Sequence, residues 1–304
     1  MSSSTRSTSR LAVPLAFATL YLVWGSTYLA LRHLVAAAPA GLSAGLRFAT
    51  AGAILYVIAR RRGAPRPSAS QWRTAAVIGA FLFTIGSGSV AYGQAAGVPS
   101  GTAAMLIATV PLWMTVLGRL RGQSTPLSAW IGLLLGFGGV AWLVRPGAGL
   151  PAASLWLVFG AAAWAHGSLS LRRGREPMGA LMAAGTQMLA GGTLLAIVGA
   201  CAGELAVPSQ LDAPAVLAWV YLVAVGSVVG FATYTWLLGR VAPAKVATYA
   251  YVNPVVALVL GAAAGEPITL DAVAAMALVL VAVAWTIRAR DPVAAARAVP
   301  PSPP

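Results

Sequence analysis

The chain has 304 residues, of which 59% are hydrophobic and 9% charged, and its formal net charge is +14. A soluble globular domain has about 25% charged residues, so this composition excludes an ordinary soluble protein. The single cysteine, Cys201, excludes an internal disulfide and a cysteine-based metal cluster.

Apolar runs follow one another along the whole chain, and about 20 such residues cross the hydrocarbon core of a bilayer as a helix. We therefore predict an all-α integral membrane protein with ten transmembrane helices. The runs cover residues 11–31, 40–59, 74–94, 99–118, 127–144, 152–171, 179–201, 214–238, 243–264 and 268–287. Because most joins are short, we expect a compact bundle without a sizeable soluble domain. Residues 1–10 and 289–304 are expected to be cytoplasmic tails.

Basic residues gather at alternate ends of these runs, which predicts the topology. They precede the first run and follow the even-numbered ones, whereas Arg32 and Arg145 fall at the other ends and Arg47 lies within the second run. Basic loops stay in the cytoplasm, so both termini should be cytoplasmic and the loop at residues 97–100 should face outside. The positive charge is then a topology signal, and no nucleic-acid partner is expected.

Two nearly identical hexapeptides, VAWLVR at residues 140–145 and VAWTIR at residues 283–288, indicate an internal repeat. The stretch that begins at Trp24 also matches the one that begins at Trp164, at a spacing of 140 residues. Repeats of this length predict a duplicated architecture.

The repeat divides the chain into residues 11–145 and residues 152–288, with five helices in each. Since five is odd, the second copy enters the membrane from the opposite side. Such inverted repeats recur in secondary transporters, where the substrate lies near the midplane between the halves. The alternative is a duplication that merely built a larger bundle.

Four segments also resemble a known family: WGSTYLALR, the Arg47-Phe48 pair, GVPSGTAAMLIATVPLW and YVNPVVALVLGAAAGE. They are similar to the repeated EamA domain of the drug/metabolite transporter superfamily, over roughly residues 11–288. The resemblance implies a ten-helix bundle whose third, fourth, eighth and ninth helices help surround a central cavity. It also implies kinship with bacterial exporters of aromatic and other amino acids. The family's Gly-Glu pair after the fourth helix is Gly122-Gln123 here, so a paired role of that glutamate is not expected in the first half.

The sequence lacks the motifs of several other functional classes. No stretch reads GxxxxGK[ST], so no ATP-binding loop is expected. All six acidic residues lie at helix ends, in loops or in the tail, so no carboxylate proton relay is expected. We predict no catalytic residue, no metal site and no cofactor, and therefore no enzyme.

Two ionisable side chains other than tyrosine are predicted to lie within the membrane. Arg47 is expected to face the bundle interior, because a charge exposed to lipid is costly. It either binds a substrate carboxylate or ties a kinked helix to neighbouring polar groups. His166 is either a hydrogen-bonded core residue or a pH-sensitive coupling group.

Aromatic and polar side chains at helical spacing supply the remaining site candidates. Residues four apart share a helix face, and the repeat should bring equivalent faces together. We predict that one central site is lined by Trp24, Tyr28, Met105, Thr109, Trp164, Tyr249 and Asn253, with Tyr92 and Tyr234 as further substrate-binding candidates. Pro111 and Pro254 should break their helices and free carbonyls there. Ordinary packing is the alternative for each of these residues.

These observations predict a secondary transporter of the bacterial inner membrane that exports small metabolites, in particular aromatic or neutral amino acids, by alternating access. Its partners are a small-molecule substrate and the lipid bilayer, and a monomer suffices. The alternatives are drug efflux, metabolite uptake or a non-transport assembly protein, which Gly132 and Gly136 would suit as a close-packing motif on the fifth helix.

Overall fold

The computed structural model describes residues 4–145, 147, 149–170, 178–205, 212–238, 240–241, 246 and 248–289. Every regular element in this part of the chain is a helix. The basic residues predicted at 172–175 and 245, and the expected tail beyond residue 289, lie outside the described residues.

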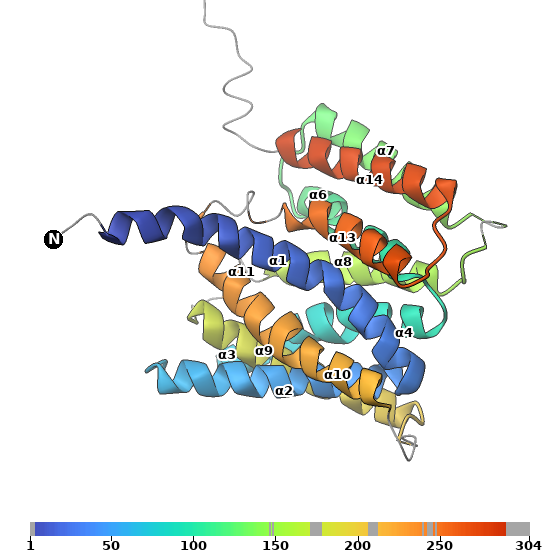
Figure 1. The fold of residues 1–304 in the computed structure, drawn as a ribbon. Helices are drawn as coiled ribbons and strands as arrows, with labels where there is room; N and C mark the ends of the chain where they lie inside the picture. Colours follow the sequence, from blue (N-terminus) through green and yellow to red (C-terminus); the bar gives the residue numbers. More distant parts are fainter. Residues whose placement is uncertain are drawn as a thin grey trace, which may run out of the picture.

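The first half of the chain contains an unbroken pair of helices followed by two interrupted ones and a final straight one (Figure 1). They are α1 (Ser4–Ala37), α2 (Ala40–Arg61), the run of α3 (Ala69–Gly79), the π-helix η1 (Ala80–Ser87) and α4 (Gly88–Ala95), the pair α5 (Ser100–Ile107) and α6 (Val110–Leu120), and α7 (Leu127–Leu143). The first helix is longer than the predicted run at both ends.

The second half has a related succession of elements. They are α8 (Ser154–Ser170), α9 (Ala180–Cys201), the run of α10 (Ala213–Tyr221), the π-helix η3 (Leu222–Val229) and α11 (Gly230–Leu238), then α13 (Tyr249–Ala263) and α14 (Leu270–Ala289). A π-helix therefore interrupts the third apolar run of each half.

Among the described residues, six helical stretches are long and apolar enough to cross a membrane. They are Leu11–Ala37, Ala40–Arg61, Ala69–Ala95, Ser100–Leu120, Ala180–Cys201 and Ala213–Leu237. Large apolar side chains on these and the shorter helices point outward: Leu134 is 75% and Phe159 69% exposed. Exposed apolar faces of this kind suit lipid as the surrounding solvent. The all-α membrane architecture is confirmed, whereas the number of ten spans stays a prediction.

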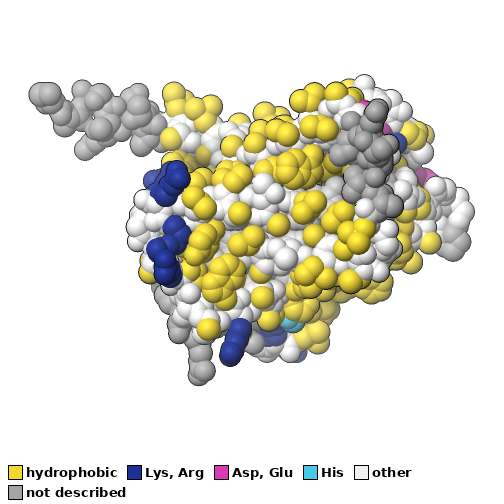
Figure 2. All heavy atoms as spheres, turned by 90° about the horizontal axis from the view of Figure 1, so that it is seen from below, with side chains coloured by type: hydrophobic (Ala, Val, Ile, Leu, Met, Phe, Trp, Pro, Cys, Tyr) yellow, Lys and Arg dark blue, Asp and Glu magenta, His cyan; other side chains and the backbone are white. Residues whose placement is uncertain are grey.

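Acidic side chains lie towards one end of the bundle, and clustered arginines lie towards the other (Figure 2). Of the described acidic residues, Glu204 follows α9, Asp212 precedes α10 and Glu266 follows α13, close to the ends where α2 and α5 begin. We call this the acidic end. Arginines follow the opposite ends of α2 and α6, and a largely hydrophobic surface separates the two ends in Figure 2.

The two halves meet through helices that pack almost backbone to backbone. On α2, a Cβ at Gly45 would lie 2.3 Å from the amide nitrogen of Ala196 on α9. On α9, a Cβ at Gly192 would lie 2.4 Å from the amide nitrogen of Ala49. Both residues must be glycine for this approach, which resembles small-residue packing of membrane helices in general. The α2–α9 pair thereby fixes the wall that carries Arg47.

Gly132 and Gly136 on α7 are also used within the chain. A Cβ at Gly132 would lie 2.2 Å from Thr286 Oγ1 on α14, and one at Gly136 would lie 2.3 Å from Leu112 Cδ1 on α6. Figure 1 shows α7 and α14 side by side. These glycines serve intramolecular packing, so they do not support the hypothesis of an assembly protein.

Candidate substrate cavity

A cavity of about 170 Å³ lies between helices of both halves. The first half contributes α1, α2, η1, α4, α5 and α6, and the second contributes α8, η3, α11 and α13. The lining is Trp24, Thr27, Tyr28, Leu31, Ala44, Arg47, Phe48, Gly86, Ser87, Val90, Ala104, Ile107, Ala108, Val110, Pro111, Met114, Trp164, Gly226, Phe231, Tyr249, Ala250, Asn253 and Pro254. It is mostly apolar, with a few polar groups, which is the usual character of a small-molecule site.

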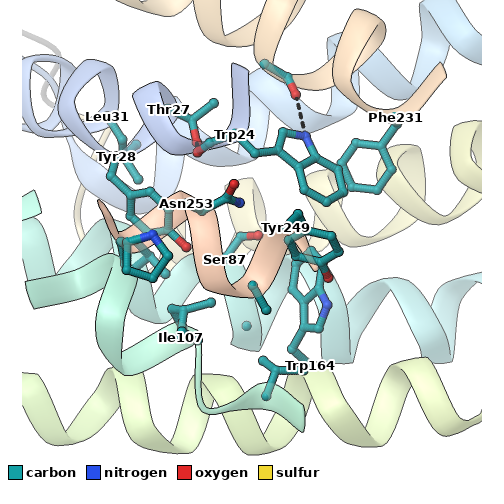
Figure 3. Close-up of a pocket in the computed structure, with 18 of the residues that line it drawn as sticks. Trp24, Thr27, Tyr28, Leu31, Ser87, Ile107, Trp164, Phe231, Tyr249 and Asn253 are labelled. Carbon is teal, nitrogen blue, oxygen red and sulfur yellow. Dashed lines mark hydrogen bonds between the residues drawn. The ribbon is translucent and has the colours of Figure 1, made fainter. Parts of the chain in front are cut away.

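Six of the predicted site residues line this cavity. They are Trp24, Tyr28, Arg47, Trp164, Tyr249 and Asn253. Figure 3 shows Trp24 of α1, Trp164 of α8, and Tyr249 and Asn253 of α13 around one space. The sequence therefore identified a set of residues that the fold brings together, and their contact with a substrate stays a prediction.

Met105 and Thr109 do not line the cavity, contrary to the prediction. Met105 is fully buried in the main hydrophobic core, and the Thr109 hydroxyl donates a hydrogen bond of 2.6 Å to the Leu106 carbonyl. Met105 follows Ala104 by one residue in α5, so it lies about 100° further round the helix than the face that Ala104, Ile107 and Ala108 share. Ala104, Ile107 and Ala108 line the cavity instead.

Tyr92 and Tyr234 also lie outside the lining. Tyr92 packs against Gly41 at the beginning of α2, near Glu204, which places it at the acidic end. Tyr234 stands behind the wall, with its ring centroid 5.3 Å from that of Trp24 and 6.1 Å from that of Tyr249. It supports the lining rings without facing the cavity.

His166 lies near the end of α8, away from the cavity. Its ring contacts that of Phe81, with centroids 4.5 Å apart and an interplanar angle of 35°, and the Arg121 Nη2 atom lies 3.2 Å from its Nδ1. A guanidinium has only donors, so a ring nitrogen that accepts from it is unprotonated. The position favours the hydrogen-bonded structural interpretation, and a coupling role stays an untested prediction.

Trp24 is the centre of an aromatic wall. Its indole Nε1 donates a hydrogen bond of 3.2 Å to the Gly226 carbonyl on η3, drawn as a dashed line in Figure 3. Its ring centroid lies 4.9 Å from that of Tyr249, edge to face, and 5.2 Å from that of Phe231. Pairs at these distances stabilise by about 0.5–1.5 kcal/mol beyond area burial. The wall therefore joins α1, α11 and α13.

The two π-helices place a matching Gly-Ser pair in each half. Gly86-Ser87 lies in η1 and Gly226-Ser227 in η3, at the same spacing of 140 residues as Trp24 and Trp164. A Cβ at Gly86 would lie 3.0 Å from Trp164 Cε3. Sequence reasoning missed these pairs, although their spacing was visible. π-Helical turns are rare and frequent at functional sites.

Two prolines each remove one helical N–H donor near the cavity. Pro111 follows the break before α6, whereas Pro254 lies inside a continuous α13, so only the first predicted break is present. Proline has no N–H to donate four residues back, to the carbonyls of Ile107 and Ala250. Both of these residues line the cavity.

Arg47 is the one charged residue among the described residues of the lining. Only 7% of it is exposed, and its Nε donates a hydrogen bond of 3.2 Å to the buried Ser227 hydroxyl. Its guanidinium carbon also lies 4.5 Å from the centroid of the Phe48 ring. Within the described part of the chain, no carboxylate forms an ion pair with it.

At the acidic end, two glutamate side chains accept hydrogen bonds from the first turns of helices. Glu266 accepts hydrogen bonds from the Ser100 amide at 2.9 Å and the Ser100 hydroxyl at 3.0 Å, and it forms an ion pair with Arg32. Glu204 accepts one of 2.7 Å from the Leu42 amide. Free amides at helix N-termini favour negative charge, so each glutamate fixes one helix of the first half to a loop of the second.

We expect Glu266→Gln to lower the stability of the folded protein by about 1–3 kcal/mol, because a nearly buried charge-assisted cap is lost. Asp271→Asn is the matched control. It breaks the Arg145–Asp271 pair, whose side chains are 42% and 45% exposed, and exposed pairs contribute about 0–1 kcal/mol. Thermal unfolding of the purified variants in one detergent would measure both, and equal shifts would contradict the capping role.

Comparisons with known proteins agree with this architecture. The model of the EamA-like transporter family matches residues 11–145 and again residues 151–288. The "Uncharacterized inner membrane transporter YedA" of Escherichia coli K12 is 38% identical over 254 residues, 82% of each chain. The "Uncharacterized transporter YvbV" of Bacillus subtilis is 25% identical over 280 residues, 90% of each chain.

A solved structure described as "Crystal structure of protein" shares the fold. It matches with a TM-score of 0.59 and 23% identity over 91% of this chain and 97% of its own. Two family matches in one chain account for the paired Trp24 and Trp164 stretches. The chain belongs to the EamA-like transporter family and is a membrane transporter of that type.

Proposed function

We propose that this chain is a secondary transporter that exports small metabolites, chiefly aromatic and neutral amino acids, by alternating access. The observation that carries the proposal is the cavity, because its walls come from both halves and rocking of one half against the other would open it to either side. The ten spans, in two inverted units of residues 11–145 and 152–288, belong to this proposal. So does a location in the bacterial inner membrane, which the name of the Escherichia coli relative supports.

The charge distribution supports cytoplasmic termini. The acidic end carries Arg32 and Arg145, and each is paired with a carboxylate, whereas the opposite end carries clustered arginines such as Arg60, Arg61 and Arg62. Retention of basic loops places that opposite end in the cytoplasm.

We expect cysteines at Ala96 and Ser124 to label from opposite sides of the membrane in a Cys201→Ala background. Both positions are exposed and lie in loops, at the acidic end and at the opposite end. A membrane-impermeant maleimide added to whole cells should modify only the Ala96 variant. Labelling of both, or of the Ser124 variant alone, would contradict the proposed topology.

Uptake of labelled amino acids into proteoliposomes that contain the purified chain tests the transport proposal. Phenylalanine, tryptophan and leucine should accumulate above empty liposomes, and arginine and glutamate should not, because the apolar walls leave a second charge unpaired. Accumulation of none of them would contradict amino-acid transport.

Direction is tested in cells. If the chain exports phenylalanine, cells that express it should retain less labelled phenylalanine than control cells. If it is an uptake transporter instead, these cells should accumulate more labelled phenylalanine than control cells. If the chain is a drug exporter, cells that express it should instead be more resistant to toxic apolar cations than control cells.

A further inference from the structure

The cavity contains a cation with unused hydrogen-bonding capacity. Arg47 has five N–H donors, and the Ser227 hydroxyl takes the one on Nε. Its terminal amino groups donate to no group of the described residues, although only 7% of the residue is exposed. A buried charge is costly unless it is paired. The empty partner position therefore suits an anion that arrives with the substrate.

The geometry of the Arg47 guanidinium favours a carboxylate as its partner. A guanidinium is planar and presents its terminal N–H groups as a fork that matches the two oxygens of a carboxylate. Ser227 and the Phe48 ring hold the guanidinium in place, at 3.2 Å from Oγ and 4.5 Å from the ring centroid respectively. Gly226 leaves the space beside it, since a Cβ there would lie 3.4 Å from Arg47 Nη2. The guanidinium is thus held through its Nε atom, and its two terminal amino groups are left to bind a carboxylate.

The other half of the chain supplies an unused acceptor. Asn253 lines the cavity from α13 and is 7% exposed, and its Oδ1 has no hydrogen-bond partner among the described residues. Ile107 and Ala250 also line the cavity, and the prolines four residues on cannot donate a helical hydrogen bond to their carbonyls. Neutral acceptors such as these can receive the N–H groups of an ammonium ion, but they cannot neutralise its charge.

We propose that Arg47 binds the substrate carboxylate and Asn253 its ammonium group, so that the cavity takes apolar α-amino acids as zwitterions and rejects amines. The inference rests on the proposed function and names its substrate class. Trp24, Trp164 and Tyr249 supply the apolar wall for the side chain. An amine without a carboxylate would meet an uncompensated guanidinium in a cavity of low polarity. The arrangement therefore disfavours the cationic drugs of the alternative function.

Three ligands that each contain a phenyl ring distinguish the proposed role of Arg47 from that of Asn253. L-Phenylalanine has both groups, 3-phenylpropionate lacks the amine and phenethylamine lacks the carboxylate. Binding to the purified chain in nanodiscs should follow that order in affinity. Arg47→Gln should weaken binding of both carboxylates by about tenfold or more, because a charge-assisted pair is lost. The same substitution should leave binding of phenethylamine unchanged or stronger.

Asn253→Ala should weaken binding of L-phenylalanine but not that of 3-phenylpropionate. Arg47→Lys keeps the charge and loses the fork, so it should restore part of the affinity for both carboxylates and provides a variant if Arg47→Gln misfolds. Equal loss for all three ligands in a folded Arg47→Gln protein would show that Arg47 only ties α2 to η3, and would overturn the inference while leaving transport intact. If the wild-type chain binds none of the three, the proposed amino-acid function fails as well.

Discussion

Gly45→Leu is expected to prevent the accumulation of correctly folded protein. A Cβ at this position would lie 2.3 Å from the amide nitrogen, 2.7 Å from Cα and 2.8 Å from Cβ of Ala196, so the new side chain meets backbone that cannot rotate away. Overpacking of a core typically costs about 1–3 kcal/mol and more where backbone must move. Here α2 and α9 would have to separate, and α2 carries Arg47 only two residues further on.

Gly138→Leu is the matched control for that substitution. Gly138 lies in α7, and apart from its chain neighbours and the backbone of its own helix no described atom lies within 4 Å of the position that a Cβ would take there. The variant should therefore express and run as wild type on size exclusion. If Gly45→Leu gave the same yield and the same melting temperature as Gly138→Leu, the close α2–α9 contact would be wrong.

Trp164→Ala is expected to raise the KM for phenylalanine by about tenfold, which corresponds to about 1.4 kcal/mol of lost binding. The indole forms part of the cavity wall opposite Trp24, and its loss removes stacking area from a large substrate. Alanine reaches less of this wall, so its KM should change much less. Initial rates of uptake into proteoliposomes would measure both constants.

Trp130→Ala controls for the loss of a tryptophan as such. Trp130 lies on α7, is 38% exposed and does not line the cavity, so neither KM should change. Tyr249→Ala should behave like Trp164→Ala, because both rings face the same space (Figure 3). A uniform rise in KM for large and small substrates would show that these rings support the fold rather than recognise the substrate.

The helices and the repeat were predictable from the sequence because membrane constraints act locally. The length of each apolar run, the alternation of basic ends and the 140-residue spacing between Trp24 and Trp164 are all visible without tertiary structure. That spacing paired Trp24 with Trp164, and the four-residue spacing of Tyr249 and Asn253 placed both on one face of their helix. Each of these side chains lies on a helix whose face the period of 3.6 residues describes well.

The failures have more than one cause. Met105 and Thr109 were chosen as the repeat counterparts of Tyr249 and Asn253, but the face of α5 that reaches the cavity carries Ala104, Ile107 and Ala108. The π-helices η1 and η3 were not predicted either, since a wider turn leaves no compositional mark. His166 lies in α8, within a predicted run, but its partner Arg121 follows a different helix and could not be named from the sequence.

The helix-end carboxylates were also beyond sequence reasoning. Glu204 and Glu266 each cap a helix of the other half, and the pairing depends on which helix ends meet in space. The family comparison of Gly122-Gln123 with a Gly-Glu pair pointed to this type of position, but it could not name Ser100 or Leu42 as the partners.

We propose that the solute crosses the membrane through the cavity shared by the two halves. Counterflow of labelled phenylalanine in proteoliposomes tests it most directly when wild type is compared with Ser87→Trp and Ile85→Trp. Ser87 lines the cavity, whereas Ile85, two residues earlier on the same π-helix, is 45% exposed on the outer surface. We expect counterflow by wild type and Ile85→Trp, and none by a folded Ser87→Trp protein whose cavity is filled. Counterflow by Ser87→Trp at the wild-type rate would contradict it.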